Sequence, residues 1–128
     1  MKTIGIGVDI VDNNRIKSLI KNKKFVSRIF SKKEITISKK YLNKTNFFSK
    51  RFAAKESFAK ALGTGFRNNL NLKDIEIIND KLGKPYYFIS PKIKKLIKKK
   101  KKIKNFQLFL SISDEKDYSV AFTIIQKI

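Results

Sequence analysis

The chain has 128 residues, 41% of them hydrophobic, which favours a single domain with a hydrophobic core. It contains no cysteine and no histidine, so disulfides, thiolate metal sites and triads that need either side chain are excluded, and a bound metal would need oxygen ligands, as Mg²⁺, Mn²⁺ or Ca²⁺ do. The net charge of +21 fits a polyanionic partner, whether nucleic acid, anionic membrane or acidic protein, but a biased genome rich in Lys, Ile, Asn and Phe would also produce it, so charge alone identifies no partner.

Alternating side chains predict a half-buried strand over residues 3–10. Positions 4, 6, 8 and 10 are apolar and share one face, whereas Gly5, Gly7 and Asp9 share the other. Two glycines in a strand indicate close approach by a ligand or by another stretch of backbone. They lead to the carboxylate of Asp9, although an acid at a strand's end is more often a turn or cap residue than a functional group.

Three short helices are predicted after this strand. The first has Asp12 or Asn13 near its cap, an apolar stripe at positions 16, 19 and 20, and Arg15 beside that stripe. A second, rich in phenylalanine and isoleucine, follows it. Ser31 followed by Glu34 has the pattern of a capping box, which predicts the start of the third.

A central helix without a breaker is predicted from about residue 47 to a glycine turn at 63–65, after a loop at 43–46. Apolar side chains cover about half of its circumference. Arg51 and Lys55 fall inside that apolar arc, and Glu56 and Lys60 lie along its edge. Cations and a carboxylate beside a buried stripe are compatible with a site that holds an anion, with or without a metal ion. On these residues alone, the favoured interpretation is snorkelling lysines and an ordinary Glu56–Lys60 pair.

The second half of the chain is predicted to hold a hairpin, a lysine-rich helix and two more strands. Strands over 74–78 and 86–89 flank turn residues at 79–85, which predicts an antiparallel hairpin. Ser90–Pro91 starts a helix that ends in the run Lys98–Lys102, interpreted as a solvated helix end and alternatively as a nucleic-acid patch. Strands over 106–113 and 118–125 complete a single domain, residues 1–128.

The chain shows no signal for membrane association. It has no uncharged apolar run of about 18 residues, and residues 1–7 lack the apolar core of a signal peptide. The lack of cysteine fits a reducing compartment. We therefore expect a soluble cytoplasmic protein without a membrane partner.

Three separated motifs extend over most of the chain: GIGVDIV at 5–11, RFAAKES with KALGTG within 51–65, and LGKP at 82–85. Together they resemble holo-[acyl-carrier-protein] synthase, the small bacterial type of 4′-phosphopantetheinyl transferase. The first two motifs are specific at this separation, whereas Gly-Lys-Pro alone is not. The resemblance implies an α+β fold with an antiparallel sheet packed against a long central helix. It also implies a homotrimer with sites at the subunit interfaces.

The same resemblance implies an activity and a set of site residues. The activity is Mg²⁺-dependent transfer of the 4′-phosphopantetheine arm from coenzyme A to a serine of apo-acyl carrier protein, leaving adenosine 3′,5′-bisphosphate. Asp9 and Glu56 are implied as the magnesium ligands, Glu56 and Lys60 as catalytic residues, and Arg15 as the cation that meets the acidic carrier protein. The implied coenzyme A contacts are Arg51, Lys55, Lys60, Gly63, Gly83, Lys84 and Pro85.

Phe109 departs from the family pattern, because many members carry a histidine at the start of the penultimate strand. A phenyl ring can pack against adenine but cannot bind phosphate. With no histidine in the chain, the acceptor of the serine proton is left open between Glu56, acting directly or through water, and a metal-bound hydroxide.

Two rival hypotheses belong to other classes. A small basic nucleic-acid-binding protein, such as a ribosome-associated one, would use the lysine run at 98–102 and exposed aromatic rings. It leaves Asp9 and Glu56 unexplained, and the aromatic spacing favours core positions at Phe48, Phe52, Phe58, Phe88 and Phe122. A catalytically dead oligomeric homologue is disfavoured by the intact acids and Lys60. Transfer to an acidic carrier protein also gives the positive charge a purpose, since complementary fields speed encounter.

Overall fold

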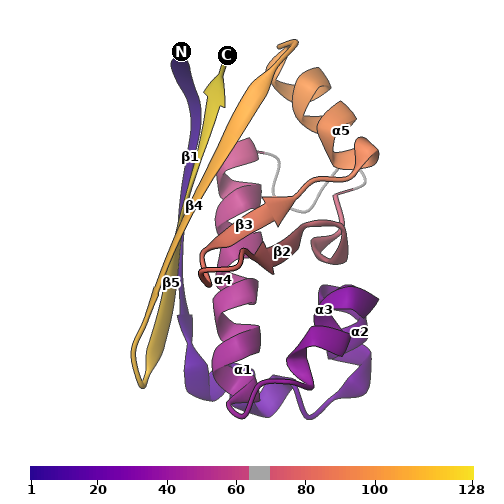
Figure 1. Ribbon diagram of the computed structural model, residues 1–128, viewed down its shortest axis with the longest axis vertical. Coiled ribbons are helices and arrows are strands. Elements are labelled where there is room, and N and C mark those ends of the chain that lie inside the picture. Colours follow the sequence, from indigo (N-terminus) through magenta and orange to yellow (C-terminus); the bar gives the residue numbers. More distant parts are fainter. Residues whose placement is uncertain (64–69) are drawn as a thin grey trace.

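The computed structural model describes residues 1–63 and 70–128, and its elements form an α+β domain as predicted (Figure 1). Thr64 and Gly65, assigned above to a glycine turn, lie outside the described residues. The elements in chain order are β1 (Lys2–Asp12), α1 (Asn13–Leu19), α2 (Lys23–Ile29), α3 (Lys32–Ser38), α4 (Lys44–Leu62), a 3₁₀ turn (Leu72–Asp74), β2 (Glu76–Asn79), β3 (Pro85–Phe88), α5 (Pro91–Lys101), β4 (Phe106–Asp114) and β5 (Tyr118–Lys127).

The long helix α4 organises the domain. It packs against β1 and β5 of a three-stranded antiparallel sheet with the order β1-β5-β4. The antiparallel hairpin of β2 and β3 packs on another side of α4, and Tyr87 of the hairpin donates a hydrogen bond to the Ala54 carbonyl at 2.7 Å. In Figure 1, α1 to α3 gather at one end of the long axis, and α5 lies near the other end with both termini.

Two glycines of β1 allow α4 to lie directly on the strand. A Cβ at Gly7 would stand 1.9 Å from the Ser57 carbonyl oxygen, and one at Gly5 would stand 2.3 Å from that of Ala61. No other residue fits at these distances. The close approach predicted for this strand is therefore made by helix backbone.

The glycine face of β1 is consequently the face that the domain buries. Ile6, Val8 and Ile10 lie on the opposite face and are 59%, 53% and 65% exposed. The expectation that their face is the buried half of the strand is wrong, because the helix occupies the glycine side. The same side of the sheet carries Phe109 and Phe122, since strand pairing places Phe122 beside Val8 and Phe109 in register with Ile6 across β5. We call Ile6, Val8, Ile10, Phe109 and Phe122 the outer face.

Capping signals define most helix starts as predicted. The Asp12 side chain accepts a hydrogen bond from the Asn14 amide and caps α1. Ser31 and Glu34 form the reciprocal capping box of α3, and the Ser90 hydroxyl accepts from the Ile93 amide at the start of α5.

Some boundaries differ from the predictions. The central helix begins at Lys44, because the Asn43 side chain accepts from the Asn46 amide and caps it there. Asp74 ends the 3₁₀ turn, so β2 begins two residues later than expected. Of the aromatic residues assigned to the core, the three on α4 are buried, but Phe88 and Phe122 are 48% and 39% exposed.

The lysine run closes α5 as a solvated helix end, with Lys102 in the left-handed conformation at the C-cap. Ile93 and Ile97 of this helix are buried and Leu96 is partly buried, so the lysines are left on its exposed side. In the part of the chain that the structure describes, no helix has the length and apolar character needed to cross a membrane.

Candidate active site

Four of the predicted site residues meet along β1, an edge strand of the sheet. Lys60 Nζ donates to Asp9 Oδ1 at 2.9 Å and to the Val8 carbonyl at 3.0 Å, which ties the last turn of α4 to the strand. Glu56, one helical turn before Lys60, is half-buried and feels the charges of Asp9, Lys60 and Arg15. We call Asp9, Arg15, Glu56 and Lys60 the β1 cluster.

The electrostatics of this cluster centre on Glu56. Burial, and then the nearby Asp9 charge, raise the pKa of Glu56, while Lys60 and Arg15 oppose the rise. Lys60 pairs with Asp9, and the ion pairs among the described residues leave Glu56 without a partner. The alternative of an ordinary Glu56–Lys60 pair is therefore wrong. Burial and the neighbouring Asp9 carboxylate both disfavour the ionised form of Glu56, and a bound cation would offset these two effects.

The donor set of the β1 cluster fits one hard cation. Asp9 and Glu56 offer carboxylate oxygens, and the described residues contain no group of three or more acidic side chains that could hold a metal alone. Mg²⁺ suits such a site, because it keeps several waters and is commonly bound through one or two carboxylates together with substrate phosphates.

Lys55 lies on the other side of α4 and is fully buried. Its Nζ donates to Glu34 Oε1 at 2.7 Å and to the carbonyl oxygens of Leu72 and Ile75 at 2.9 and 2.6 Å. These bonds use all three donors of an ammonium group. Burial lowers the pKa of Lys55, and the Glu34 charge opposes that shift. A coenzyme A contact by Lys55 stays a prediction, and in this geometry its donors hold the start of the hairpin against α4.

Arg51 is also buried and reaches the predicted coenzyme A turn only through another residue. Its Nη2 donates to Asn79 Oδ1 at 2.9 Å, and Asn79 Nδ2 donates to the Gly83 carbonyl at 3.0 Å. The guanidinium also lies 3.6 Å from the centre of the Phe47 ring. The sequence gives no signal for Asn79, because an asparagine beside a turn is ordinary and its partner lies 28 residues away.

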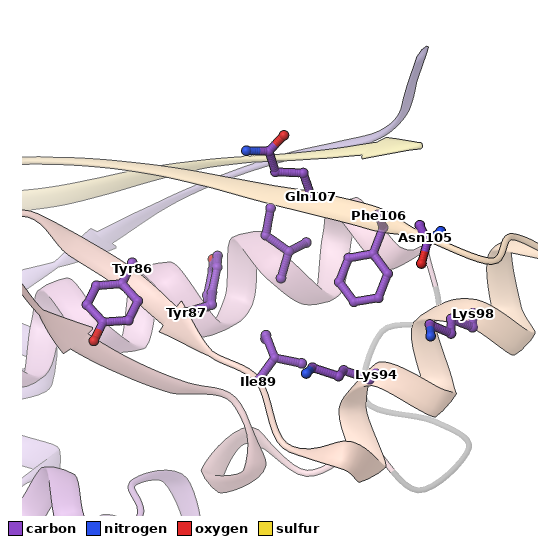
Figure 2. Close-up of a pocket in the computed structure, with 9 residues that line it drawn as sticks. Tyr86, Tyr87, Ile89, Lys94, Lys98, Asn105, Phe106 and Gln107 are labelled. Carbon is purple, nitrogen blue, oxygen red and sulfur yellow. The ribbon is translucent and has the colours of Figure 1, made fainter. Parts of the chain in front are cut away.

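The turn Gly83–Lys84–Pro85 lies beside β4. It borders a groove of about 330 Å³ whose lining residues include Lys84, Pro85, Tyr86, Phe109 and Phe122. A second cavity of about 460 Å³ shares four lining residues with it and extends between β3 and β4 to Lys94 and Lys98 of α5 (Figure 2). Aromatic walls with nearby ammonium groups suit a planar base that carries phosphate.

The β1 cluster and this groove lie at opposite edges of the sheet. In the order β1-β5-β4, Asp9 belongs to one edge strand and Phe109 to the other. Gly63, a further predicted coenzyme A contact, lies at the C-cap of α4 with φ +83°. A single copy of the chain therefore does not bring the two predicted halves of the site together.

Comparison with known proteins gives a consistent result. The sequence profile of the 4′-phosphopantetheinyl transferase superfamily matches residues 5–123. Holo-[acyl-carrier-protein] synthase of Pelagibacter ubique (strain HTCC1062) is 62% identical over 127 residues, with 99% of each chain covered. The structure of holo-[acyl-carrier-protein] synthase from Neisseria meningitidis is 39% identical with a TM-score of 0.87, covering 98% of this chain and 99% of that one. The synthase from Bacillus anthracis in complex with CoA (3′,5′-ADP) is 34% identical with a TM-score of 0.82 and complete coverage of both chains.

Proposed function

The chain belongs to the 4′-phosphopantetheinyl transferase superfamily, and on that premise we propose how its residues carry out the transfer. The enzyme moves the 4′-phosphopantetheine group from coenzyme A to a serine hydroxyl of apo-acyl carrier protein and releases adenosine 3′,5′-bisphosphate. The observation that carries the proposal is the β1 cluster, in which two acids and two cations converge at one edge of the sheet.

The proposal assigns a Mg²⁺ ion to Asp9 and Glu56. Bound there, the ion supplies positive charge to the pyrophosphate oxygens of coenzyme A. The support is the donor set described above, together with the raised pKa of Glu56, because burial and the Asp9 charge disfavour the ionised carboxylate and a cation would offset both. Lys60 complements the pair, because its side chain is 55% exposed and can neutralise a phosphate oxygen.

In the transfer, Glu56 accepts the proton of the serine hydroxyl. The serine oxygen then bonds to the phosphorus that carries pantetheine, and the bond from this phosphorus to the oxygen of the leaving adenosine 3′,5′-bisphosphate breaks. The Lys60 ammonium neutralises the charge that develops on the leaving oxygen.

The nucleotide end of coenzyme A is assigned to the groove beside β4. Phe109 packs against adenine there, and Lys84 offers its ammonium to a phosphate. Among the other predicted coenzyme A residues, Gly63 lies at the exposed end of α4, and Arg51 and Lys55 support the hairpin from within the core.

We assign the carrier protein to α1, beside the β1 cluster. Arg15 is exposed on this helix and lies close enough to influence the charge of Glu56. An acidic carrier protein that docks on Arg15 would therefore bring its serine next to the proton acceptor.

A homotrimer completes the proposal, with each site built from the β1 cluster of one copy and the β4 groove of a neighbour. Two observations support shared sites. The two halves lie at opposite edges of the sheet, and an exposed apolar outer face lies between those edges. The number three comes from the family resemblance.

The test is incubation with coenzyme A, Mg²⁺ and apo-acyl carrier protein, followed by mass measurement of the carrier protein. The carrier should gain one phosphopantetheine arm. Asp9→Ala and Glu56→Ala should each abolish the gain while the protein stays folded, because the core of the domain does not include either carboxylate. Near-normal Mg²⁺-dependent turnover in either variant would contradict the metal assignment.

A triple variant of Lys99, Lys100 and Lys101 to Gln is the control. It removes three charges from α5, at the opposite end of the molecule from α1 (Figure 1). Turnover at saturating carrier protein should stay near normal. Loss of activity together with loss of tight RNA binding would favour the nucleic-acid hypothesis instead.

A further inference from the structure

Asn79 connects the buried part of the hairpin to the exposed turn that follows it. Its amide has two ends with different partners, because the oxygen accepts from Arg51 of α4 and the nitrogen donates to the carbonyl of Gly83. Arg51, Asn79 and Gly83 thus form a continuous hydrogen-bonded path from the central helix to the turn. We infer that Asn79 is a positioning residue for coenzyme A, which holds the Gly83–Lys84–Pro85 turn at a fixed place relative to α4. This inference rests on the proposed assignment of that turn to the nucleotide.

Hydrogen bonds within the turn hold its shape. Asp80 holds it from within, since its carboxylate accepts from the amides of Leu82 and Lys84, both at 2.9 Å. Gly83 has φ +87°, and a Cβ placed there would meet nothing within 4 Å. Gly83 therefore faces open space. The path through Asn79 supplies a link from the Gly83 carbonyl to the core.

Burying the charged side chain of Arg51 costs free energy, which favours a specific role for it in holding the turn. Burial lowers its pKa, and it forms no ion pair with a carboxylate among the described residues. Its Nε is buried without a hydrogen-bond partner in that same part of the chain. Among the described residues, Arg51 donates to the Phe47 carbonyl, which lies one turn earlier on the same helix, and to Asn79, which lies on the hairpin. Burying a guanidinium costs free energy in proteins. The bond to Asn79 links this buried group to the turn that we assign to coenzyme A.

The two ends of the amide allow a sharp experiment. Asn79→Asp keeps an oxygen acceptor for Arg51 and adds a charge that suits the guanidinium, but it removes the donor to Gly83. Asn79→Ala removes both bonds. If the path positions the turn, both variants should weaken coenzyme A binding by roughly five- to tenfold, the effect of one lost hydrogen bond. Asn79→Asp should nevertheless melt within about 2 °C of the wild type, because its bond to the core remains.

The measurements are calorimetric titration with coenzyme A, saturation kinetics for both substrates, and thermal melting. The KM for coenzyme A should rise, while kcat and the KM for carrier protein should change by less than about twofold. Asn71→Asp is the matched control, since Asn71 is exposed at the start of the 3₁₀ turn and its side chain makes no capping bond. It should behave as wild type.

A second variant separates this inference from the function on which it rests. Gly83→Ala strains the turn directly, because its positive φ is unfavourable for alanine. If Gly83→Ala weakens coenzyme A binding and Asn79→Asp does not, the positioning role of Asn79 is wrong and the turn keeps its assigned place. If neither variant weakens binding, the turn does not contact the nucleotide, and the inference fails with that assignment. Loss of thermal stability without a selective rise in the coenzyme A KM would also overturn it.

Discussion

The neighbours of Glu56 change the protonation behaviour of an otherwise ordinary glutamate side chain. It follows Lys55, whose charge is fully engaged in the core, and it faces Asp9, whose carboxylate already pairs with Lys60. The raised pKa means that the folded protein pays a cost to keep Glu56 ionised. A carboxylate whose ionised form is disfavoured in this way is expected at a site that binds a cation during function, even though it lowers the stability of the fold.

We predict that Glu56→Gln stabilises the free protein at neutral pH. The pKa of Glu56 is higher in the folded state than in the unfolded state, so its ionisation on raising the pH destabilises the fold. The variant should therefore melt above the wild type at pH 7. The difference should shrink as the pH falls through the raised folded-state pKa and should vanish below the ordinary value of 4.5, where the wild-type group is protonated in both states. Thermal melts across this pH range would check the sign, and a variant that melts lower at pH 7 would contradict it.

The same pair of proteins tests the magnesium assignment without an activity assay. Added Mg²⁺ should raise the melting temperature of the wild type and narrow its gap to Glu56→Gln, because binding to the folded state stabilises it. Asp9→Asn should lose the response to Mg²⁺ as well. Equal responses in all three proteins would place the metal elsewhere.

Substitution of Arg15 tests whether the positive charge at this position contributes to binding of the carrier protein. Arg15→Gln should raise the KM for carrier protein by about tenfold, because a cation at the docking surface is lost. The KM for coenzyme A should change much less. Lys17→Gln, on the same short helix and also exposed, is the matched control and should have a smaller effect. Wild-type use of carrier protein should also weaken as salt screens exposed charges beyond about 8–10 Å. A defect confined to coenzyme A would move Arg15 into the nucleotide site.

At the scale of elements, α4 presents different sides to different parts of the molecule. Its small side chains lie against the glycine face of β1, its buried cations Arg51 and Lys55 face the hairpin, and Glu56 and Lys60 lie at the strand edge. The sequence could predict this helix and the place of its charges, because helical periodicity is local. It could not predict that the two inner cations serve the hairpin, since their acceptors lie 17 to 28 residues further on.

The sequence could predict which residues of β1 share a face, but it could not predict which of the two faces is buried. Strict alternation separates glycine from isoleucine and valine, and hydrophobicity alone would bury the larger side chains. The helix backbone instead requires the space that glycine leaves. The position of Asp9 and the role proposed for it both depend on this contact between the glycines and the helix backbone. Asp9 shares the glycine face and therefore meets Lys60.

Gly7→Ala should therefore disrupt both the fold and the site. The added methyl would overlap the Ser57 carbonyl, and backbone cannot rotate away as a side chain can. We expect a loss of about 3 kcal/mol in the free energy of unfolding, measured by urea denaturation. Any folded fraction should respond less to Mg²⁺, since α4 and β1 are pushed apart. Gly83→Ala is a control with the same added methyl and no overlap, and it should cost about 1 kcal/mol through its positive φ. Equal losses would show that the close contact is not the cause.

At the scale of the whole molecule, the two halves of the proposed site lie at opposite edges of the sheet, with the apolar outer face between them. The outer face exposes side chains that a stable monomer would normally cover. The groove beside β4, which we assign to the nucleotide, lies at one edge of this surface, and the β1 cluster lies at the other. Covering the outer face with further copies of the chain would bury the apolar groups and bring unlike edges together in one step. The sequence could suggest this assembly only by resemblance, since no local pattern reports which face a second copy covers.

Shared sites predict that two inactive variants restore one another. Asp9→Ala lacks the metal side, and a double variant with Lys84→Ala and Phe109→Ala lacks the nucleotide side, so each should be nearly inactive alone. After unfolding and refolding together in equal amounts, random assembly should place an intact cluster against an intact groove at about a quarter of the interfaces. Activity should return to about that fraction of the wild type, because each complete site needs one good half from each neighbour. Mixing without unfolding is the control, since subunits that do not exchange cannot combine their halves. If the refolded mixture stays as inactive as its components, each site lies within one chain and the shared arrangement is wrong. If Val8→Asp on the outer face gives a folded monomer with wild-type activity, the outer face is not the surface that assembles the site.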